Sequence, residues 1–217
     1  PVLFRGSRYA DRLPIGDMHT IATAPRSALV TFYDEWYRPD LMAVVAVGDF
    51  DAAKVEQMIR QRFAGIPDPA APRPRPTYPV PDHDSTLVSV VTDPEATTSD
   101  VAMYFLQPVP ADRTVGDFRA GLVRALYNDM LTDRLDEIAQ RPNAPFLDAQ
   151  SAQGQLVRSK DTYVLSALVK DGGIANGLRT LLTEAACVEQ HGGKATELER
   201  EKATILRETE RAYDERD

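Results

Sequence analysis

The sequence predicts an α+β fold in which an antiparallel-rich sheet carries helices packed on one face, with two units joined by a proline-rich linker. Segments with the apolar spacing of helices are interspersed with short Val-rich segments, without the regular alternation that a doubly wound parallel sheet requires. Seven prolines in residues 66–81 separate two hydrophobic parts of the chain. We therefore expect one unit in residues 1–65, a linker in residues 66–82 and a second unit in residues 83–217.

The first unit is expected to contain a helix, a strand and a second helix. Residues 27–37 place apolar side chains at helical spacing, and Pro39 cannot continue that helix. Residues 41–47 are rich in Val and uncharged, which is typical of a short strand buried on both faces. Asp51 can then cap a helix over residues 52–63.

The proline-rich segment is predicted to be a semi-rigid spacer. Proline lacks an amide hydrogen and fixes its own backbone, so residues 66–81 favour extended polyproline geometry over a helix or a central strand. A docking site for proline-reading modules is the alternative interpretation. The position of the segment between two hydrophobic parts of the chain, rather than in a disordered tail, favours the spacer.

The second unit is predicted to open with two strands and a long helix. Residues 86–91 and 101–107 are rich in strand-forming residues, and a polar turn lies between them. Thr114 and Asp117 have the spacing of a capping box, which starts a helix over residues 115–140. The apolar stripe of this helix contains Phe118, Leu122, Leu126, Met130, Leu131, Leu135 and Ile138.

The rest of the second unit is predicted to contain a hairpin and two helices. Residues 146–154 and 162–169 have the pattern of paired strands, and residues 174–190 form a helix entered through two glycines. Thr196 and Glu199 are expected to open a last, densely charged helix that does not end within the chain.

Composition and charge exclude several classes of protein. With 43% hydrophobic and 27% charged residues, the chain has the composition of an ordinary globular protein. Its net charge of -8 argues against a general binder of nucleic acids or anionic membranes. No apolar run approaches the ~20 residues of a membrane helix. The first residues have neither an initiator Met nor a signal-peptide pattern, so we expect the sequence to come from within a longer chain.

No catalytic, cofactor-binding or metal-ligating residue is predicted. His19, His83 and His191 are isolated from one another, and none has the spacing of a local zinc motif. Cys187 cannot form an internal disulfide, because it is the single cysteine, and its apolar neighbours favour the role of a small buried hydrophobe.

Acidic residues on the predicted long helix are the remaining candidates for acid–base chemistry. Asp129 with Asp133, and Asp133 with Glu137, share one helix face at four-residue spacing. Arg124 and Arg134 lie nearby in the sequence, so a solvated face with balanced charge is favoured over a catalytic role.

Two longer stretches carry a resemblance to a known family. The stretches "RLPIGDMHTI" and "FYDEWYRPDLMAVVAVGDFDAAKVEQMIRQRF", followed by the proline-rich segment, resemble the end of the first domain in the pitrilysin/insulinase family of zinc metallopeptidases. The stretch "ALYNDMLTDRLDEIAQ", with the strands and helices behind it, resembles the second, non-catalytic domain of that family. The "RLPIG" form is most similar to large bacterial periplasmic members.

The resemblance implies a metallopeptidase fold of the LuxS/M16 type and places the metal chemistry elsewhere. Family members bind zinc through an inverted His-x-x-Glu-His helix and a downstream Glu, and the Glu inside the motif activates a metal-bound water. These residues would lie upstream of Pro1. The helix over residues 115–140 is similar to the second-domain counterpart of the zinc helix, but it carries Arg124, Asn128 and Asp129 and no His. The resemblance therefore assigns no catalytic residue and no metal ligand to this chain.

The resemblance implies that the chain is the non-catalytic portion of a bacterial zinc-dependent endopeptidase and helps to form the chamber that holds the peptide. Zinc would belong to the parent protein, whose partners would be peptide or protein substrates and whose location would be the periplasm or cell envelope. This portion alone would be inactive, would bind no cofactor and could self-associate through residues 41–47. A catalytically inactive scaffold or partner subunit of the same family is the alternative, and an unrelated α+β binding module is a third interpretation.

Overall fold

The computed structural model describes residues 2–12 and 14–216 and divides the chain into two compact units. One unit contains the N-terminal residues up to Asp11 together with the chain from Tyr78 onward, and the other contains Arg12–Thr77. The stretch before Arg12 thus belongs to the larger unit in the structure. The domain boundaries expected from the sequence remain a prediction.

The smaller unit contains the two helices that its sequence predicts and one, α1 (Met18–Thr23), that it does not. After α1, α2 spans Arg26–Trp36 and ends at the cap residue before Pro39. A short 3-10 helix, η2, covers Pro39–Leu41. Helix α3 (Ala52–Phe63) begins at Asp51, whose carboxylate accepts hydrogen bonds from the backbone amides of the next turn.

The strand predicted over residues 41–47 is absent from the described part of the smaller unit. Leu41 closes η2, and the residues after it have no regular secondary structure. Val45 and Val47 are 80% and 92% exposed. The prediction is wrong for this chain because a strand needs a partner to satisfy its backbone groups, and none of the described residues pairs with this segment.

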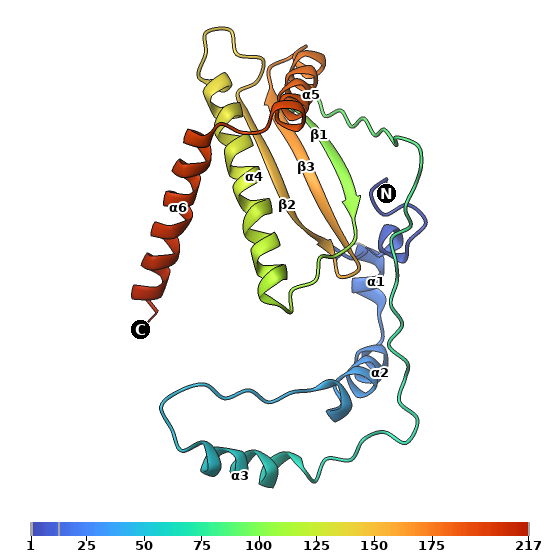
Figure 1. Ribbon diagram of the computed structural model, residues 1–217. Coiled ribbons are helices and arrows are strands. Elements are labelled where there is room, and N and C mark those ends of the chain that lie inside the picture. Colours follow the sequence, from blue (N-terminus) through green and yellow to red (C-terminus); the bar gives the residue numbers. More distant parts are fainter. Residues whose placement is uncertain (1, 13, 217) are drawn as a thin grey trace. The chain divides into compact units, whose positions relative to one another are not determined.

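The larger unit is built on a three-stranded antiparallel sheet with helices on one face (Figure 1). Strands β1 (Ser99–Gln107), β2 (Asp148–Val157) and β3 (Lys160–Val169) lie in the order β1-β3-β2, so β3 is central. Helix α4 (Val115–Ala139) packs against β2, and α5 (Ile174–His191) packs against β3 and β1. Helix α6 (Ala195–Asp214) lies against α4. The predicted α+β class with an antiparallel sheet is confirmed.

Residues 86–91, predicted as a strand, have no regular secondary structure either. They precede β1, but β3 is the only described strand that pairs with β1. Val88, Val90 and Val91 are exposed. As for residues 41–47, an apolar pattern typical of a strand does not produce one where no described strand forms backbone hydrogen bonds with the segment.

A capping box starts α4, and a single capping hydrogen bond starts α6. Helix α4 begins at Thr114, which shares reciprocal hydrogen bonds with Asp117, as predicted. Helix α6 begins two residues earlier than predicted, because the Glu197 carboxylate accepts the backbone amide of Lys194 at 2.8 Å. The prediction that Thr196 and Glu199 form the cap is therefore wrong. This helix ends at Asp214, within the chain.

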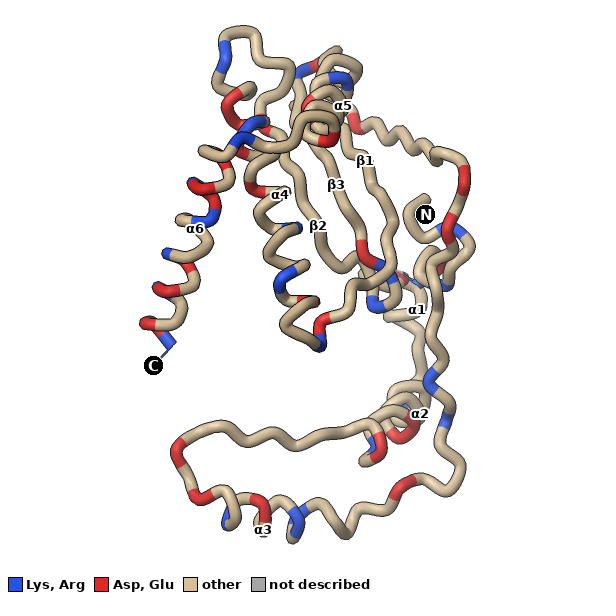
Figure 2. Tube along the Cα trace, in the orientation of Figure 1, with Lys and Arg blue, Asp and Glu red and all other residues tan. Residues whose placement is uncertain are grey.

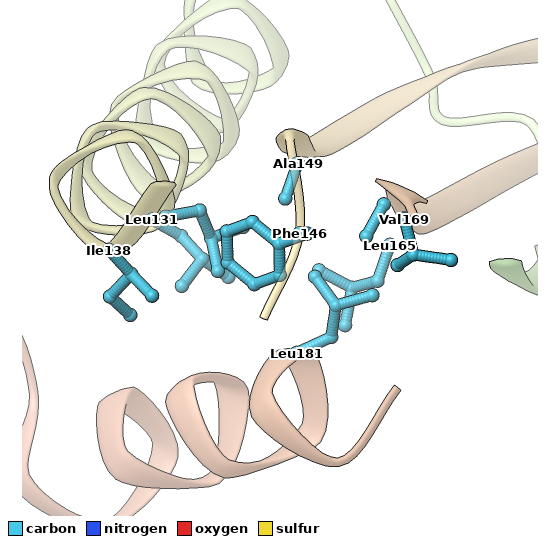
Figure 3. Packing of buried hydrophobic residues seen from close by; sticks show 9 residues of the cluster. Leu131, Ile138, Phe146, Ala149, Leu165, Val169 and Leu181 are labelled. Carbon is cyan, nitrogen blue, oxygen red and sulfur yellow. The ribbon is translucent and has the colours of Figure 1, made fainter. Parts of the chain in front are cut away.

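The core lies between the sheet and helices α4 and α5 (Figure 3). It consists of Leu131, Leu135, Ile138, Phe146, Ala149, Leu165, Ala167, Val169 and Leu181. Gly177 brings α5 close to β3, because a Cβ at this position would lie 2.6 Å from Val169 Cγ1. Phe118 and Leu122, predicted to belong to the apolar stripe of α4, are exposed instead.

Among the described helices, none is both long enough and apolar enough to cross a membrane.

Candidate functional site on the sheet-facing side of α4

The side of α4 that faces the sheet changes character along the helix. In its C-terminal half this side is apolar, and Leu131 and Leu135 are fully buried. In its N-terminal half the same side carries Arg124 and Asn128, which are four residues apart and therefore neighbours on the helix surface. This polar stripe explains why Phe118 and Leu122 turn outward and why the apolar prediction fails for that half.

Ser151 of β2 is the centre of a hydrogen-bonded cluster that joins α4 to the sheet. Its backbone amide donates to Thr132 Oγ1 at 3.1 Å, and Thr132 Oγ1 donates to the Ser151 carbonyl at 3.2 Å. Ser151 Oγ donates to Asn128 Oδ1 at 2.7 Å. The hydroxyl of Tyr163 lies 3.1 Å from Ser151 Oγ and 3.2 Å from the hydroxyl of Tyr127. The cluster fixes the position and rotation of α4 over β2.

The surroundings of Tyr163 shift the pKa of its phenol. Burial raises its pKa well above the usual value, and the neighbouring Tyr127 hydroxyl adds to the rise, while Ser151 opposes it. The phenol therefore stays protonated near neutral pH. The cluster formed by Ser151, Tyr163, Asn128 and Tyr127 can donate and accept hydrogen bonds, and the protonated Tyr163 phenol cannot act as a base at that pH.

Ion pairs join α4 to α6 beside this cluster. Arg134 binds Glu197 through two hydrogen bonds, with Nε 3.1 Å from Oε1 and Nη2 2.7 Å from Oε2. Arg200 Nη2 lies 2.6 Å from Asp133 Oδ2. Charged residues of both signs follow one another along α6 (Figure 2). The charge of Asp133 is thus balanced from another helix, and not by the sequence neighbours Arg124 and Arg134 as predicted.

Other acidic residues of α4 are less well compensated. Burial raises the pKa of Asp129, and the carboxylates of Asp133 and Glu208 add to the rise. Burial likewise raises the pKa of Asp136, together with Asp148 and Asp133. These shifts stem first from burial and then from neighbouring like charges, so they indicate a local electrostatic cost rather than catalysis.

The three histidines lie on different parts of the chain. His19 is in α1, His83 follows the proline-rich segment and His191 is the last residue of α5. Within residues 2–12 and 14–216, no group of three or more His, Cys, Asp or Glu side chains could hold a metal ion. The absence of a metal site stays a prediction from the sequence.

A hollow on the outer face of α5 contains the single cysteine. It has a volume of ≈ 670 Å³ and is lined by Ala175, Leu178, Arg179, Leu182, Thr183, Ala186, Cys187, Gln190 and His191. Cys187 is half-buried, rather than buried as predicted. All of these residues belong to one helix, so the hollow has no opposing wall to hold a ligand or to exclude water.

The sequence reasoning missed the cluster around Ser151. The signal was present, because Ser151, Gln153 and Gln155 alternate along β2 and must therefore point to one face. Their register with β3 places them on the face that carries Leu165 and Tyr163, which is the helix-covered face. Polar residues on the covered side of a strand indicate either a buried network or an open end of the core.

Comparison with known proteins gives a consistent result. Residues 23–133 match the family described as the peptidase M16 inactive domain. The chain is 32% identical over 217 residues to a zinc protease PQQL-like protein of Arabidopsis thaliana, covering all of this chain and 20% of that protein. It is 25% identical over 216 residues to the probable zinc protease PqqL of Escherichia coli, covering 99% of this chain and 23% of that protein. The chain thus spans less than a quarter of the length of these relatives.

Solved structures resemble the fold. The first half of the periplasmic protease PqqL from Escherichia coli superposes with a TM-score of 0.82 at 24% identity, covering 100% of this chain and 46% of that chain. The ferredoxin protease FusC, solved as a mutant in complex with Arabidopsis ferredoxin, has a TM-score of 0.74 at 22% identity, covering 94% and 23%. A predicted insulinase-family protease from Yersinia pestis has a TM-score of 0.71 at 17% identity, covering 99% and 46%.

Proposed function

We propose that this chain, which belongs to the peptidase M16 inactive domain family, is a non-catalytic part of a zinc-dependent endopeptidase and forms part of the wall of its peptide-holding chamber. The activity belongs to the parent protein, and residues 1–217 supply structure and binding surface. The relatives named as zinc proteases support this assignment for the parent.

The proposal rests on the side chains that α4 presents to the sheet. By the family resemblance, α4 is the counterpart of the zinc helix, yet it presents Arg124 and Asn128 to the sheet. Asn128 accepts a hydrogen bond from Ser151, which supports a structural role for this side of α4 rather than metal binding. Guanidinium, amide and hydroxyl groups are poor zinc ligands beside His, Cys and carboxylates. These residues do not fit zinc, and no catalytic step is assigned to them.

Substrate and location follow from the relatives as proposals. FusC has been solved with ferredoxin bound, which supports a protein or peptide as the ligand of the parent. PqqL of Escherichia coli is described as periplasmic, which supports the periplasm as the location. Aromatic side chains are available to such a ligand, because Phe105 of β1 and Tyr127 of α4 both lie against Tyr163 of β3 and are partly exposed.

Zinc content and peptide cleavage test whether the activity belongs to the parent and not to this chain. The 217-residue chain should contain no stoichiometric zinc after chelation and dialysis, and it should cleave no peptide. The full-length parent should bind zinc and cleave peptides. One equivalent of zinc bound to histidines of the isolated chain would overturn the assignment. A parent that is free of zinc and inactive would support the inactive scaffold instead.

The chamber wall is tested by photo-crosslinking in the full-length parent. A photoreactive amino acid at Phe105 should crosslink to a bound peptide, because this side chain lies exposed on the helix-covered face. The same amino acid at Tyr213, which is exposed on α6, is the matched control and should not crosslink. Equal labelling at both positions, or none at Phe105, would contradict the proposal that the face around Phe105 contacts the bound peptide.

A further inference from the structure

Arg124 carries a charge that no described residue neutralises by contact. Its side chain is half-buried, and no hydrogen bond or ion pair joins it to the residues that the structure describes, whereas Arg134 of the same helix is bound by Glu197. Withdrawing a charged group from water without a partner costs free energy. The guanidinium is therefore held in a state that an anionic ligand would stabilise.

Arg124 helps to lower the pKa of Asp117, but the Asp117 carboxylate already accepts hydrogen bonds from other groups. The pKa of Asp117 is lowered mainly by the backbone amide of Arg113 and the hydroxyl of Thr114, with Arg124 as the smallest contribution. The same oxygen atom, Oδ2, accepts the Arg113 amide at 3.1 Å, the Thr114 amide at 3.0 Å and the Thr114 hydroxyl at 2.9 Å. Asp117 caps α4 and leaves the guanidinium free.

Gly121 gives the guanidinium room on the helix surface. The Arg124 side chain runs back toward the start of α4, and its Nη2 atom lies 3.8 Å from the position that a Cβ of Gly121 would occupy. A long side chain at residue 121 would compete for this space. The guanidinium thus has a defined place beside the sheet, one turn from the hydrogen-bonded cluster.

Further donors lie next to Arg124. The Oδ1 atom of Asn128 accepts from Ser151, so the amide hydrogens of Asn128 face away from that bond and meet no acceptor in the described chain. The Tyr127 hydroxyl, on a partly exposed side chain, is 3.2 Å from the Tyr163 hydroxyl. Arg124, Tyr127 and Asn128 are three and four residues apart and share one helix surface. This surface is rich in donors and has few acceptors.

An aromatic side chain of β1 lies next to the tyrosine pair beside these donors. Phe105 of β1 is 45% exposed and lies with its ring centroid 5.7 Å from that of Tyr163. A ligand at Arg124 would therefore have an anionic group beside an apolar or aromatic one.

We propose that Arg124, with Tyr127 and Asn128, forms a subsite for the free C-terminal carboxylate of a peptide whose last side chain is apolar. A carboxylate carries only acceptors and matches the fork of a guanidinium with two parallel hydrogen bonds. Phe105 would cover the last side chain. The choice of a peptide as the source of the carboxylate rests on the proposed function, whereas the donor arrangement does not.

The test compares two forms of one peptide on the 217-residue chain. A fluorescein-labelled pentapeptide ending in Phe is prepared with a free carboxylate and with a C-terminal amide, and binding is followed by fluorescence anisotropy. The free acid should bind at least about tenfold more tightly, since hydrogen bonds to charged groups are each worth about 1.5–3 kcal/mol. Equal binding of the two forms, or binding of neither, overturns the proposal.

Matched variants locate the subsite. Arg124→Gln should abolish the preference for the acid, whereas Arg119→Gln, which removes the same charge from an exposed position of α4, should keep it. Arg124→Lys keeps the charge without the fork and should retain a reduced preference, provided that circular dichroism shows unchanged folding. A preference that survives both changes at residue 124 overturns the assignment. If the parent cleaves peptides but the chain binds the acid and the amide equally, only the subsite is rejected. If the chain prefers the acid but the parent has no peptidase activity, only the proposed function is rejected.

Discussion

Arg38 Nη2 donates a hydrogen bond of 2.7 Å to the backbone oxygen of Arg73 and so fastens the proline-rich segment to the end of α2. Arg38 is 5% exposed, and its Nε atom lies 3.1 Å from Asp40 Oδ1. The Arg73 guanidinium in turn lies 5.4 Å from the centroid of the Trp36 ring and forms an ion pair with Glu35. The aromatic and charged residues before Pro39 therefore hold the start of the spacer.

We predict that Arg38→Ala loosens this segment. The backbone oxygen of Arg73 loses its donor and the Trp36 ring loses a neighbour, so residues 66–76 should be cut several-fold faster by a protease of broad specificity. Mass spectrometry of a limited digest locates the cuts. Arg75→Ala is the control, because Arg75 has no side-chain hydrogen bond within the described residues. In the unsubstituted chain, cleavage of β1 before this segment would contradict its role as a spacer.

A second prediction concerns the cluster that holds α4 on β2. Ser151→Ala removes a buried hydroxyl and leaves the half-buried Asn128 Oδ1 without its donor, which should lower the free energy of unfolding by about 1–3 kcal/mol in urea titrations. Ser166→Ala is the matched control on β3, because the Ser166 hydroxyl makes no hydrogen bond to any described residue. Equal effects of the two substitutions would show that the Ser151 hydroxyl contributes nothing to stability.

The third prediction concerns acid stability. Hydrogen bonds from Arg134 lower the pKa of Glu197 below its model-compound value of 4.5, so this pair stabilises the fold above that pH. Its contribution is lost as the pH falls through the lowered pKa of the folded state. Glu197→Gln should therefore reduce Tm near neutral pH and flatten its fall between about pH 5 and about pH 3.

Asp129 and Asp136 change the stability with pH in the direction opposite to Glu197. Burial raises the pKa of each, so the folded state binds their protons more tightly than the unfolded state does. Their stabilising contribution is complete below the unfolded pKa and is lost as the pH rises through the folded pKa. Asp129→Asn should raise Tm at neutral pH and leave it unchanged at acid pH. A loss of Tm at neutral pH would mean that the ionised carboxylate has a stabilising partner.

The sequence predicts local features of this fold well because their causes are local. Pro39 ends α2, Asp51 caps α3, and Thr114 with Asp117 caps α4, each through contacts within one turn. Strand formation in residues 41–47 depends on a partner that no local pattern supplies. The sheet-facing side of α4 was misjudged for the same reason. Its polar half is decided by Ser151 on another element, which sequence spacing on the helix does not reveal.

The last prediction concerns the apolar segment at residues 41–47, which leaves backbone groups and Val side chains without a partner in the described part of its unit. Val44, Val45 and Val47 are exposed, and such a segment tends to pair with another copy or to bury its apolar face against one. We therefore predict that the 217-residue chain self-associates through this segment, with a mass that rises with concentration in light scattering.

Val45→Lys should return the chain to the monomer, because a charge in the middle of the segment disfavours both strand pairing and apolar burial. Val115→Lys makes the same chemical change at an exposed position of α4, which lies in no unpaired strand-like segment, and should leave the association intact. Hydrogen exchange adds an independent reading, since amides of residues 42–47 should gain protection as the concentration rises. A chain that stays monomeric at high concentration would sink the prediction, and protection of these amides in the dilute monomer would point to a partner within the chain itself.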